Sequence, residues 1–561
     1  MSRLIKLNSH KKEIVLLISI SLVVIGFVPQ LTIRIIRDAN NPYNVEPLAL
    51  ESEDGTYISS FLYTPKGEKS HGGIVVSHRY WGDKKTMEPL SIELVRRGFS
   101  VISIDFRGHG ASGGQFIWSE LVNDMKAAVD YFEYELPYIT QIGLIGHSLG
   151  ATIAAELAKA YPNKINATVA IGSLNFDPSG ISNLLMMFGQ IESVVAEERL
   201  LDALRIYTGE ENVSIGRLYF GDFIGGNNTK AFIGDFSNHL SSITDPSIMH
   251  EIVQWFEQVF NDTPAENIVL TEWFLEIFSL FSQLGIILLY FILIIYISNI
   301  YIKKKNDPQE EETTEAPKID VKRLISYFTL IIMGFGIIFL FFFLSIPRDI
   351  IQLTVATSTL LINVGAVIAV FVLLLFLIMN SETDFSFKSY KSKIRILFSA
   401  QFKRSLVFGI SSALLLIMFL FMFWNLPYQT SLSEGRNWGI IISLIFSSFP
   451  IFFIKEFYLR ILQDNLKKSK TYAEYFKMVF IGIFMENLII VFIFSVIWLN
   501  VVYMPISILY FSAWIRFSII LNVVVPFIYI YAGRSIIGSA IFSSVIYAWL
   551  TVIILPSYGF L

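Results

Sequence analysis

Ser148 stands in a sequence pattern that can turn a serine into a nucleophile. It is the central residue of Gly146-His-Ser-Leu-Gly150, a G-x-S-x-G pentapeptide. The apolar run 141–145 before it predicts a β-strand, and the small-residue run that starts at Ala151 predicts a helix. A sharp strand-to-helix turn leaves the serine hydroxyl exposed, and the flanking glycines avoid collisions with neighbouring backbone. The pattern therefore predicts an activated serine at the carboxyl end of a strand.

A general base for this serine is predicted near residue 240. His239 follows Thr229-Lys-Ala-Phe-Ile-Gly234, which predicts a final strand, and it precedes an amphipathic helix at 247–260. An imidazole can accept the proton of a serine hydroxyl within hydrogen-bond reach, and His239 is the candidate for this role. We interpret the remaining histidines of this region as structural or solvated: His78, His109, His147 and His250.

The elements that must position these residues alternate between strand and helix. Short apolar runs rich in β-branched residues predict strands at 72–78, 100–105, 141–145 and 165–171. Amphipathic stretches between them predict helices at 84–97, 117–136 and 150–161. Continuous apolar strands alternating with helices indicate a mostly parallel sheet with helices on both faces, and open parallel sheets place their sites at the carboxyl ends of the strands.

Two further blocks accompany the serine pentapeptide. Ser77-His-Arg-Tyr-Trp-Gly82 is similar to an H-G-x-x-G motif, and Asp105-Phe-Arg-Gly-His-Gly-Ala-Ser-Gly113 is similar to D-x-R-G-x-G-x-S. On these three blocks the region resembles the α/β-hydrolase superfamily, in its esterase, lipase and peptidase branch. The resemblance implies an oxyanion hole made by the backbone N–H of Leu149 and that of Tyr80 or Arg79. It also implies a general base after the last strand, the position that His239 fits. Arg79 departs from the family pattern, which has glycine there.

The resemblance also implies an acid after the seventh strand. Two aspartates remain open for it, and so does the absence of an acid, which would favour a degenerate module. Asp222 ends the run 216–222, which could form that strand, although only 17 positions separate it from His239. Asp177, just past the fourth apolar strand, is the alternative. Residues 179–208, including 184–188 and 200–207, are predicted to be helical, either as a lid over an acyl pocket or as a helical pair packed on the sheet.

The remainder of the chain is predicted to lie in a membrane. The sequence is 53% hydrophobic and only 16% charged, and the charges concentrate before residue 265. An apolar run at 14–33 predicts a transmembrane anchor within residues 1–36, followed by the inserted hydrolase-like domain at 37–265. Residues 266–561 are predicted to form about eight transmembrane helices, with a disordered cytoplasmic loop near 303–322. The apolar segments lie near 273–300, 325–346, 350–379, 405–424, 438–455, 478–502, 505–531 and 535–556.

The distribution of basic residues predicts the orientation of these helices. Lysine and arginine cluster in alternate loops on the side of the N-terminus, which the positive-inside rule assigns to the cytoplasm. The domain at 37–265 then lies on the extracytoplasmic side of a multi-pass cell-membrane protein. Glu486 and Arg516 fall at similar depths in adjacent apolar segments, and they form either a structural ion pair or a polar site for a headgroup, small substrate or ion.

Composition also narrows the class of function. A net charge of −4 argues against a nucleic-acid partner, and the absence of cysteine excludes disulfides and a thiolate nucleophile. No metal or cofactor site is predicted. We expect a membrane-anchored serine hydrolase that cleaves an ester, thioester or amide bond of a small-molecule or lipid-like acyl substrate, in contact with membrane lipids. The alternative is a transporter or receptor-like membrane protein with a degenerate α/β-hydrolase binding module.

Overall fold

The protein was analysed as a computed structural model that describes only part of the chain. It describes residues 9–40, 43–261, 269–301, 402–423, 479–483 and 521–554, together with a few single residues between 445 and 476. Within these ranges it leaves out residues 67–71, 81, 193–195, 222, 236, 240, 530 and 533–535. The chain divides into two compact units. One holds residues 20–285, and the other includes the second half of α7 (Glu272–Tyr301) with α11 (Phe402–Phe423) and α15 (Ile536–Ile554).

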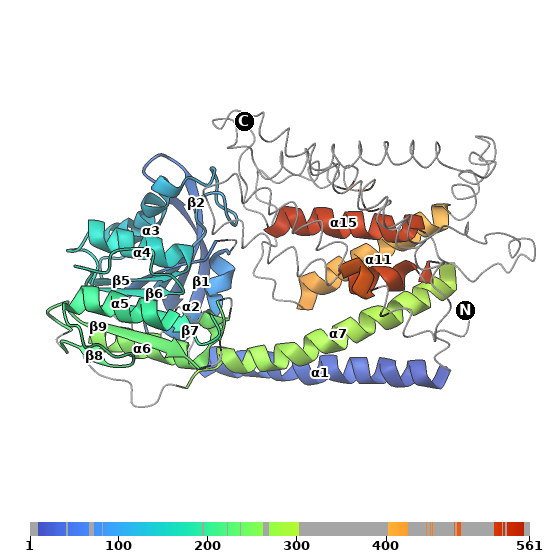
Figure 1. The fold of residues 1–561 in the computed structure, drawn as a ribbon, viewed down its shortest axis with the longest axis horizontal. Helices are drawn as coiled ribbons and strands as arrows, with labels where there is room; N and C mark the ends of the chain where they lie inside the picture. The colour runs from blue at the N-terminus through green and yellow to red at the C-terminus, as the bar shows by residue number, and fades with distance from the viewer. Residues whose placement is uncertain are drawn as a thin grey trace, which may run out of the picture. The chain divides into compact units, whose positions relative to one another are not determined.

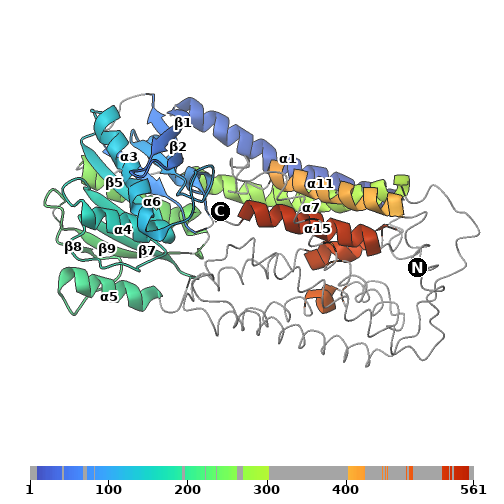
Figure 2. The same ribbon diagram turned by 90° about the horizontal axis from the view of Figure 1, so that it is seen from above.

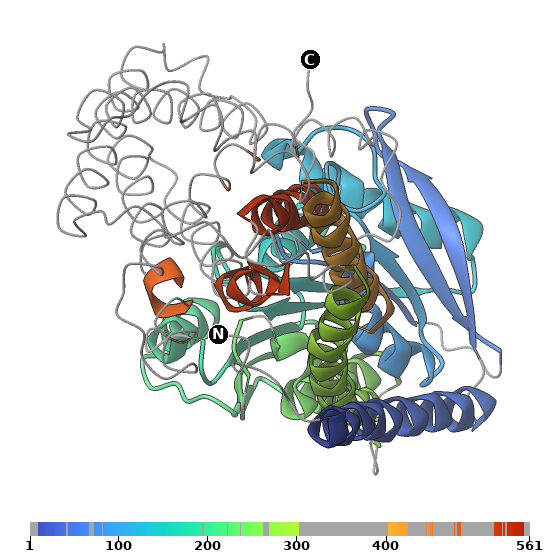
Figure 3. The same cartoon turned by 90° about the vertical axis from the view of Figure 1, so that its right-hand side faces the viewer.

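A nine-stranded sheet forms the centre of the first unit, in the order β1-β2-β4-β3-β5-β6-β7-β9-β8. Six neighbouring strands of this sheet run parallel to one another: β4, β3, β5, β6, β7 and β9. At the edges of the sheet, β1, β2 and β8 pair antiparallel. The β1–β2 hairpin forms one edge of the sheet (blue in Figure 3). The strands are β1 (Tyr43–Glu51), β2 (Tyr57–Pro65), β3 (Gly72–Ser77), β4 (Ser100–Ile104), β5 (Gln141–His147), β6 (Ala167–Ile171), β7 (Leu184–Gly189), β8 (Leu218–Tyr219) and β9 (Thr229–Gly234).

Helices cover both faces of this sheet, as its fully apolar strands require. Helices α3 (Leu121–Glu135) and α4 (Leu149–Ala160) pack side by side on one face, and α2 (Glu88–Val95) and α6 (Pro246–Asn261) pack together on the other (Figure 1). The α6 helix approaches the sheet closely, because a Cβ on Gly143 of β5 would lie 2.3 Å from the ring of Phe256. Trp255 and Phe256 are fully buried in the resulting core. The predicted mostly parallel α/β sheet is thereby confirmed.

One predicted helix is in fact a strand. Residues 184–188 belong to β7, whose six residues are all buried and pair in parallel with β6 and β9. A short apolar run without β-branched residues suits a buried helix and a buried strand equally, so the sequence pattern could not separate them. The helical prediction holds only for α5 (Ala196–Thr208), which packs on β7 and β9 (Figure 2). The run 216–222 contributes the two-residue antiparallel β8 rather than a parallel seventh strand.

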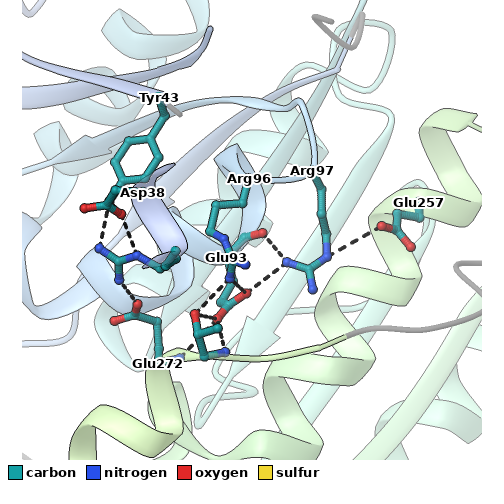
Figure 4. A network of polar contacts seen from close by, with 9 residues as sticks. Asp38, Tyr43, Glu93, Arg96, Arg97, Glu257 and Glu272 are labelled. Carbon is teal, nitrogen blue, oxygen red and sulfur yellow. Dashed lines mark hydrogen bonds and ion pairs between the residues drawn. The ribbon is translucent and has the colours of Figure 1, made fainter. Parts of the chain in front are cut away.

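The end of α1 (Ser9–Asn40) and the start of α7 meet in a buried polar network beside the hydrolase-like domain (Figure 4). Arg37 near the end of α1 forms an ion pair with Glu272 and bonds to Asp38 at 2.7 Å and to the Tyr43 hydroxyl at 3.0 Å. The side chains of Arg37 and Glu272 are only 5% and 7% exposed. A buried ion pair of this kind constrains geometry more than it stabilises, so the network sets how the two helices meet the first strand.

Glu93 of α2 joins this network to the sheet. Its buried carboxylate accepts the N–H groups of Thr271 and Glu272 at 2.7 and 3.1 Å, and it therefore caps the first turn of α7 from a different helix. Arg96 and Arg97 bond the other carboxylate oxygen at 3.1 and 3.0 Å. Burial raises the pKa of Glu93, but these donors outweigh it and hold that pKa below its usual value. The α2 helix thus fixes the start of α7 to the domain.

Two helices in the described part of the chain are long and apolar enough to cross a membrane: Lys12–Asn40 and Glu272–Ser298. They lie side by side near Gly26, where a Cβ would meet the backbone of Ser282. In the second unit, α7 lies beside α11 (Figure 2). The Tyr290 hydroxyl of α7 bonds the Ser412 carbonyl of α11 at 3.3 Å. Several predicted membrane segments, together with Glu486 and Arg516, lie outside the described residues.

Candidate active site

Ser148 occupies the turn between β5 and α4 in a backbone conformation that serine rarely adopts. Its φ is 57° and its ψ is −108°. Its amide donates to the Ile171 carbonyl of β6 at 2.7 Å, which holds the turn against the sheet. Added Cβ atoms at Gly146 and Gly150 would lie 2.0 Å from the Gly150 carbonyl oxygen and 2.6 Å from the Ser77 carbonyl oxygen. Both glycines are therefore required by the close backbone approach that the sequence pattern predicted.

His239 links this serine to a carboxylate. Its Nε2 lies 2.9 Å from Ser148 Oγ, and its Nδ1 bonds to Glu192 Oε1. The Glu192 side chain is 6% exposed, whereas that of His239 is 29% exposed. A neutral imidazole that donates from Nδ1 to a carboxylate leaves Nε2 free to accept the serine proton. The three side chains therefore have the connectivity of a nucleophile, a base and an orienting acid.

Glu192, and not Asp177, is the carboxylate that bonds to His239 Nδ1. Asp177 is 55% exposed and bonds to Lys159 and Ser179, so it is not the carboxylate on His239 Nδ1. Asp222 lies outside the described residues. The resemblance implies an acid after the seventh strand, and Glu192 lies three residues after the end of β7.

The turn after β7 explains why the third residue beyond it becomes the acid. Gly189 ends the strand, its N–H donates to Glu192 Oε2 at 3.0 Å, and its carbonyl accepts the Glu192 amide at 3.1 Å. β7 pairs in parallel with β9 in register Gly189–Gly234, so the loops after the two strands lie together. The signal in the sequence was an apolar run closed by glycine and followed by a glutamate, but it is visible only if 184–189 is taken as a strand.

A further glycine brings the backbone close to this triad. Gly172, directly after β6, has a φ of +71°, and a Cβ there would lie 3.0 Å from Glu192 Oε1 and 3.0 Å from His239 Cε1. The side chains of Glu192 and His239 therefore pack against bare backbone. Sequence reasoning did not identify Gly172, because no motif marks it.

The predicted oxyanion donors lie around the same turn. Leu149 is the first residue of α4, and the N–H of a first helical residue has no acceptor within its helix. The loop that carries Arg79 and Tyr80 follows β3 and touches this turn, since a Cβ on Gly150 would lie 2.9 Å from the His78 carbonyl oxygen. The loop after β3 thus lies against the turn of Ser148, which stands at the positive end of α4.

His78 holds that loop in shape. Its Nδ1 donates to the Arg79 carbonyl at 2.7 Å, and its Nε2 accepts the Phe106 amide at 3.1 Å. These two bonds require the neutral ring with the proton on Nδ1. Complete burial lowers the pKa of His78 to about 3, so the ring keeps this state at neutral pH. The interpretation of His78 as structural agrees with this geometry.

The Asp105–Gly113 block forms buried ion pairs and hydrogen bonds beside the site. Asp105 accepts the Lys84 amide at 2.6 Å, the Lys84 ammonium at 2.5 Å and the Ala111 amide at 2.8 Å. Arg107 is buried and bonds to Asp124 and Asp54, both at 2.7 Å. Asp105 and Arg107 therefore order the loops beside the oxyanion region and carry no group toward Ser148.

No cluster of three or more metal-ligating side chains occurs in the part of the chain that the structure describes.

Comparison with known proteins agrees with this geometry. A family model described as serine aminopeptidase, S33, matches residues 68–214, a range that includes Ser148 and Glu192. A serine hydrolase-like protein of Danio rerio is 23% identical over 167 residues, which cover 27% of this chain and 49% of that protein. A monoacylglycerol lipase of Mycolicibacterium smegmatis is 27% identical over 141 residues, covering 24% of this chain and 50% of that protein.

The chain thus spans about half the length of the curated relatives it matches. Among solved structures, an esterase from Pyrococcus furiosus aligns with a TM-score of 0.33 and 17% identity, over 39% of this chain and 92% of that one. The family and relative matches, taken with the order of the sheet, show that residues 68–214 lie in an α/β-hydrolase domain of the serine-hydrolase class.

Proposed function

We propose that this chain is a membrane-anchored serine hydrolase that cleaves ester, thioester or amide bonds through an acyl-enzyme. Ser148 is the nucleophile, His239 the general base and Glu192 the acid that orients and stabilises His239. The oxyanion hole consists of the Leu149 N–H and the N–H of Tyr80 or Arg79. The observation that carries the proposal is the chain of hydrogen bonds from Glu192 through His239 to Ser148.

The proposed reaction has two halves. In the first, Ser148 Oγ attacks the acyl carbon while its proton passes to His239 Nε2, and the same proton then leaves with the departing alcohol, thiol or amine. In the second, water attacks the acyl-enzyme, gives a proton to His239 Nε2, and displaces Ser148 Oγ, which recovers that proton. Glu192 stabilises the imidazolium that forms in each half. Each oxyanion donor contributes about 3–4 kcal/mol to the stability of the tetrahedral intermediate.

Two features support a lipid-like or otherwise apolar acyl substrate at a membrane. Helices α1 and α7 each have the length and hydropathy to span a bilayer, and both are joined to the domain through the Arg37–Glu272 and Glu93 contacts. One of the relatives is named a monoacylglycerol lipase. The geometry around His239 also weakens the alternative of a degenerate binding module, because His239 bonds to both Ser148 and a buried carboxylate.

Activity-based labelling tests the enzyme proposal. Full-length protein in membranes is treated with a fluorophosphonate, beside Ser148→Ala, His239→Ala and the matched control Ser179→Ala. Ser179 lies outside the proposed site and bonds to Asp177. We expect wild type and Ser179→Ala to label, and the two site variants to lose labelling. Equal labelling of wild type and Ser148→Ala would contradict the proposed nucleophile.

The absence of native cysteine allows a clean test of the proposed topology. Single cysteines are introduced as Ser179→Cys in the hydrolase domain and Lys304→Cys after α7, and intact cells are treated with a membrane-impermeant maleimide. We expect labelling of Ser179→Cys in intact cells and of Lys304→Cys only after permeabilisation. The reverse pattern would place the domain on the cytoplasmic side.

A further inference from the structure

His147 makes a contact with the proposed base that the mechanism above does not use. Its ring is fully buried, and its centroid lies 5.1 Å from that of His239. The two rings are tilted by 42°. His147 Nε2 lies 2.8 Å from the backbone carbonyl oxygen of His239. A carbonyl only accepts, so Nε2 must carry the ring proton and donate it.

This bond connects the residue before the nucleophile to the loop that carries the base. His147 is the last residue of β5 and precedes Ser148, whereas His239 lies 92 positions further on in a turn outside any strand or helix. The turn is closed by the Ser241 and Ser242 amides, which both donate to the Asn238 carbonyl. The Ser242 hydroxyl adds longer contacts, at 3.3 Å to His147 Nε2 and 3.4 Å to the His239 carbonyl.

Three groups therefore hold His239 in the free enzyme: Ser148 on Nε2, Glu192 on Nδ1 and His147 on the backbone carbonyl. Only two of them can persist in the acyl-enzyme. Once Ser148 Oγ is esterified it has no proton to donate, so the bond from the serine to Nε2 is lost. His239 must nevertheless stay in place, because its Nε2 then takes the proton of the attacking water.

We infer that His147 is a positioning residue that holds His239 over the acyl carbon during deacylation. The inference rests on the proposed function. In that step the water oxygen bonds to the acyl carbon, one water proton moves to His239 Nε2, and the bond from the acyl carbon to Ser148 Oγ breaks as Oγ recovers the proton. His147 forms and breaks no bond to the substrate, and its own hydrogen bond is the same before and after each step.

The environment of His147 suits this role. Burial and the neighbouring His239 together lower the pKa of His147 well below its usual value, so its ring remains neutral. A neutral ring places no positive charge beside the imidazolium that forms on His239. It also keeps Nε2 as a donor and leaves the general-base role to the partly exposed His239.

The test compares variants of the full-length protein in lipid nanodiscs. His147→Phe keeps a ring of similar shape but removes the donor, whereas His147→Gln keeps an N–H donor near the position of Nε2. Ser242→Ala is the matched control, since it removes only the longer contacts. Acylation is followed by the rate of fluorophosphonate labelling, and deacylation by the steady-state phase of p-nitrophenyl butyrate hydrolysis after any burst.

For His147→Phe we expect deacylation to slow about tenfold, the effect of one ordinary hydrogen bond, while labelling changes by less than about threefold. A burst should appear, with kcat and KM falling together and kcat/KM nearly unchanged. His147→Gln and Ser242→Ala should stay within about twofold of wild type in both steps. These results would separate a role in positioning from a general loss of folding, which lowers both steps alike.

Two results would overturn the inference: equal slowing of both steps in His147→Phe, or a deacylation defect in His147→Gln as large as in His147→Phe. If His147→Phe does not fold, His147→Gln alone decides, because any deacylation defect of several-fold in a variant that retains the donor contradicts the role. A wild type that neither labels nor hydrolyses the ester refutes the proposed function itself. A wild type that does both, beside an unchanged His147→Phe, refutes only the inference about His147.

Discussion

Glu192→Gln is the substitution that most directly tests the proposed site. The side chain keeps its size but loses its charge, and its amide can donate a hydrogen bond toward His239 Nδ1. That donation would favour the tautomer with the proton on Nε2, which cannot accept a proton from Ser148. We therefore expect a loss of kcat with little change in substrate binding.

The size of the expected loss of kcat follows from the burial of the Glu192 carboxylate, whose side chain is 6% exposed. Two unit charges about 4 Å apart at an effective dielectric constant of about 20 attract by about 4 kcal/mol. Loss of that stabilisation of the imidazolium lowers the rate about 10³-fold. Misorientation of the histidine in the Ser-His-Asp template costs about 10⁴-fold, so the expected loss lies between about 10³- and 10⁴-fold.

The assay is hydrolysis of a p-nitrophenyl ester by full-length protein in membranes, together with the rate of fluorophosphonate labelling. Asp177→Asn is the matched control, because that carboxylate is 55% exposed and bonds to Lys159. Asp222→Asn tests the remaining candidate. Both are expected to stay within about twofold of wild type. The assignment of the acid would be refuted if Glu192→Gln hydrolysed the ester within threefold of the wild-type rate while Asp222→Asn or Asp177→Asn was inactive.

Three further outcomes follow from the structure. Gly172→Ala places a Cβ 3.0 Å from Glu192 Oε1 at a φ of +71°, so labelling should slow at least about tenfold while stability falls by only about 1–2 kcal/mol in denaturant titrations. Asp105→Asn leaves the Lys84 ammonium buried without its counter-charge and should destabilise by about 3–5 kcal/mol, measured as a lower thermal midpoint. His78 has a folded pKa of about 3 against 6.5 in the unfolded chain, so its contribution to stability falls as pH drops below about 6.5 and has lost about 2 kcal/mol by pH 5. A His78→Gln variant should therefore show a weaker dependence of unfolding free energy on pH between 5 and 7; an unchanged slope would contradict the buried neutral ring.

Much of this domain was predictable from local sequence, because its signals are local. The G-x-S-x-G pentapeptide, the strand before it and the helix after it lie within about twenty consecutive residues, and the structure has β5, Ser148 and α4 there. The strands at β3, β4, β6 and β9 were also predicted, since continuous apolar runs bounded by helices are typical of a parallel sheet covered on both faces. The β1–β2 hairpin was not predicted.

Tertiary structure alone decided which carboxylate meets His239. Glu192 and His239 are 47 positions apart and come together because β7 and β9 pair in parallel with Gly189 opposite Gly234. Nothing local to Glu192 reports that pairing, and the six-residue apolar strand before it is too short to be distinguished from a helix by its periodicity. Local sequence likewise does not report the bond from His147 to the His239 carbonyl. Sequence determined the nucleophile turn through short-range steric rules, whereas long-range strand pairing decided the partners of the base.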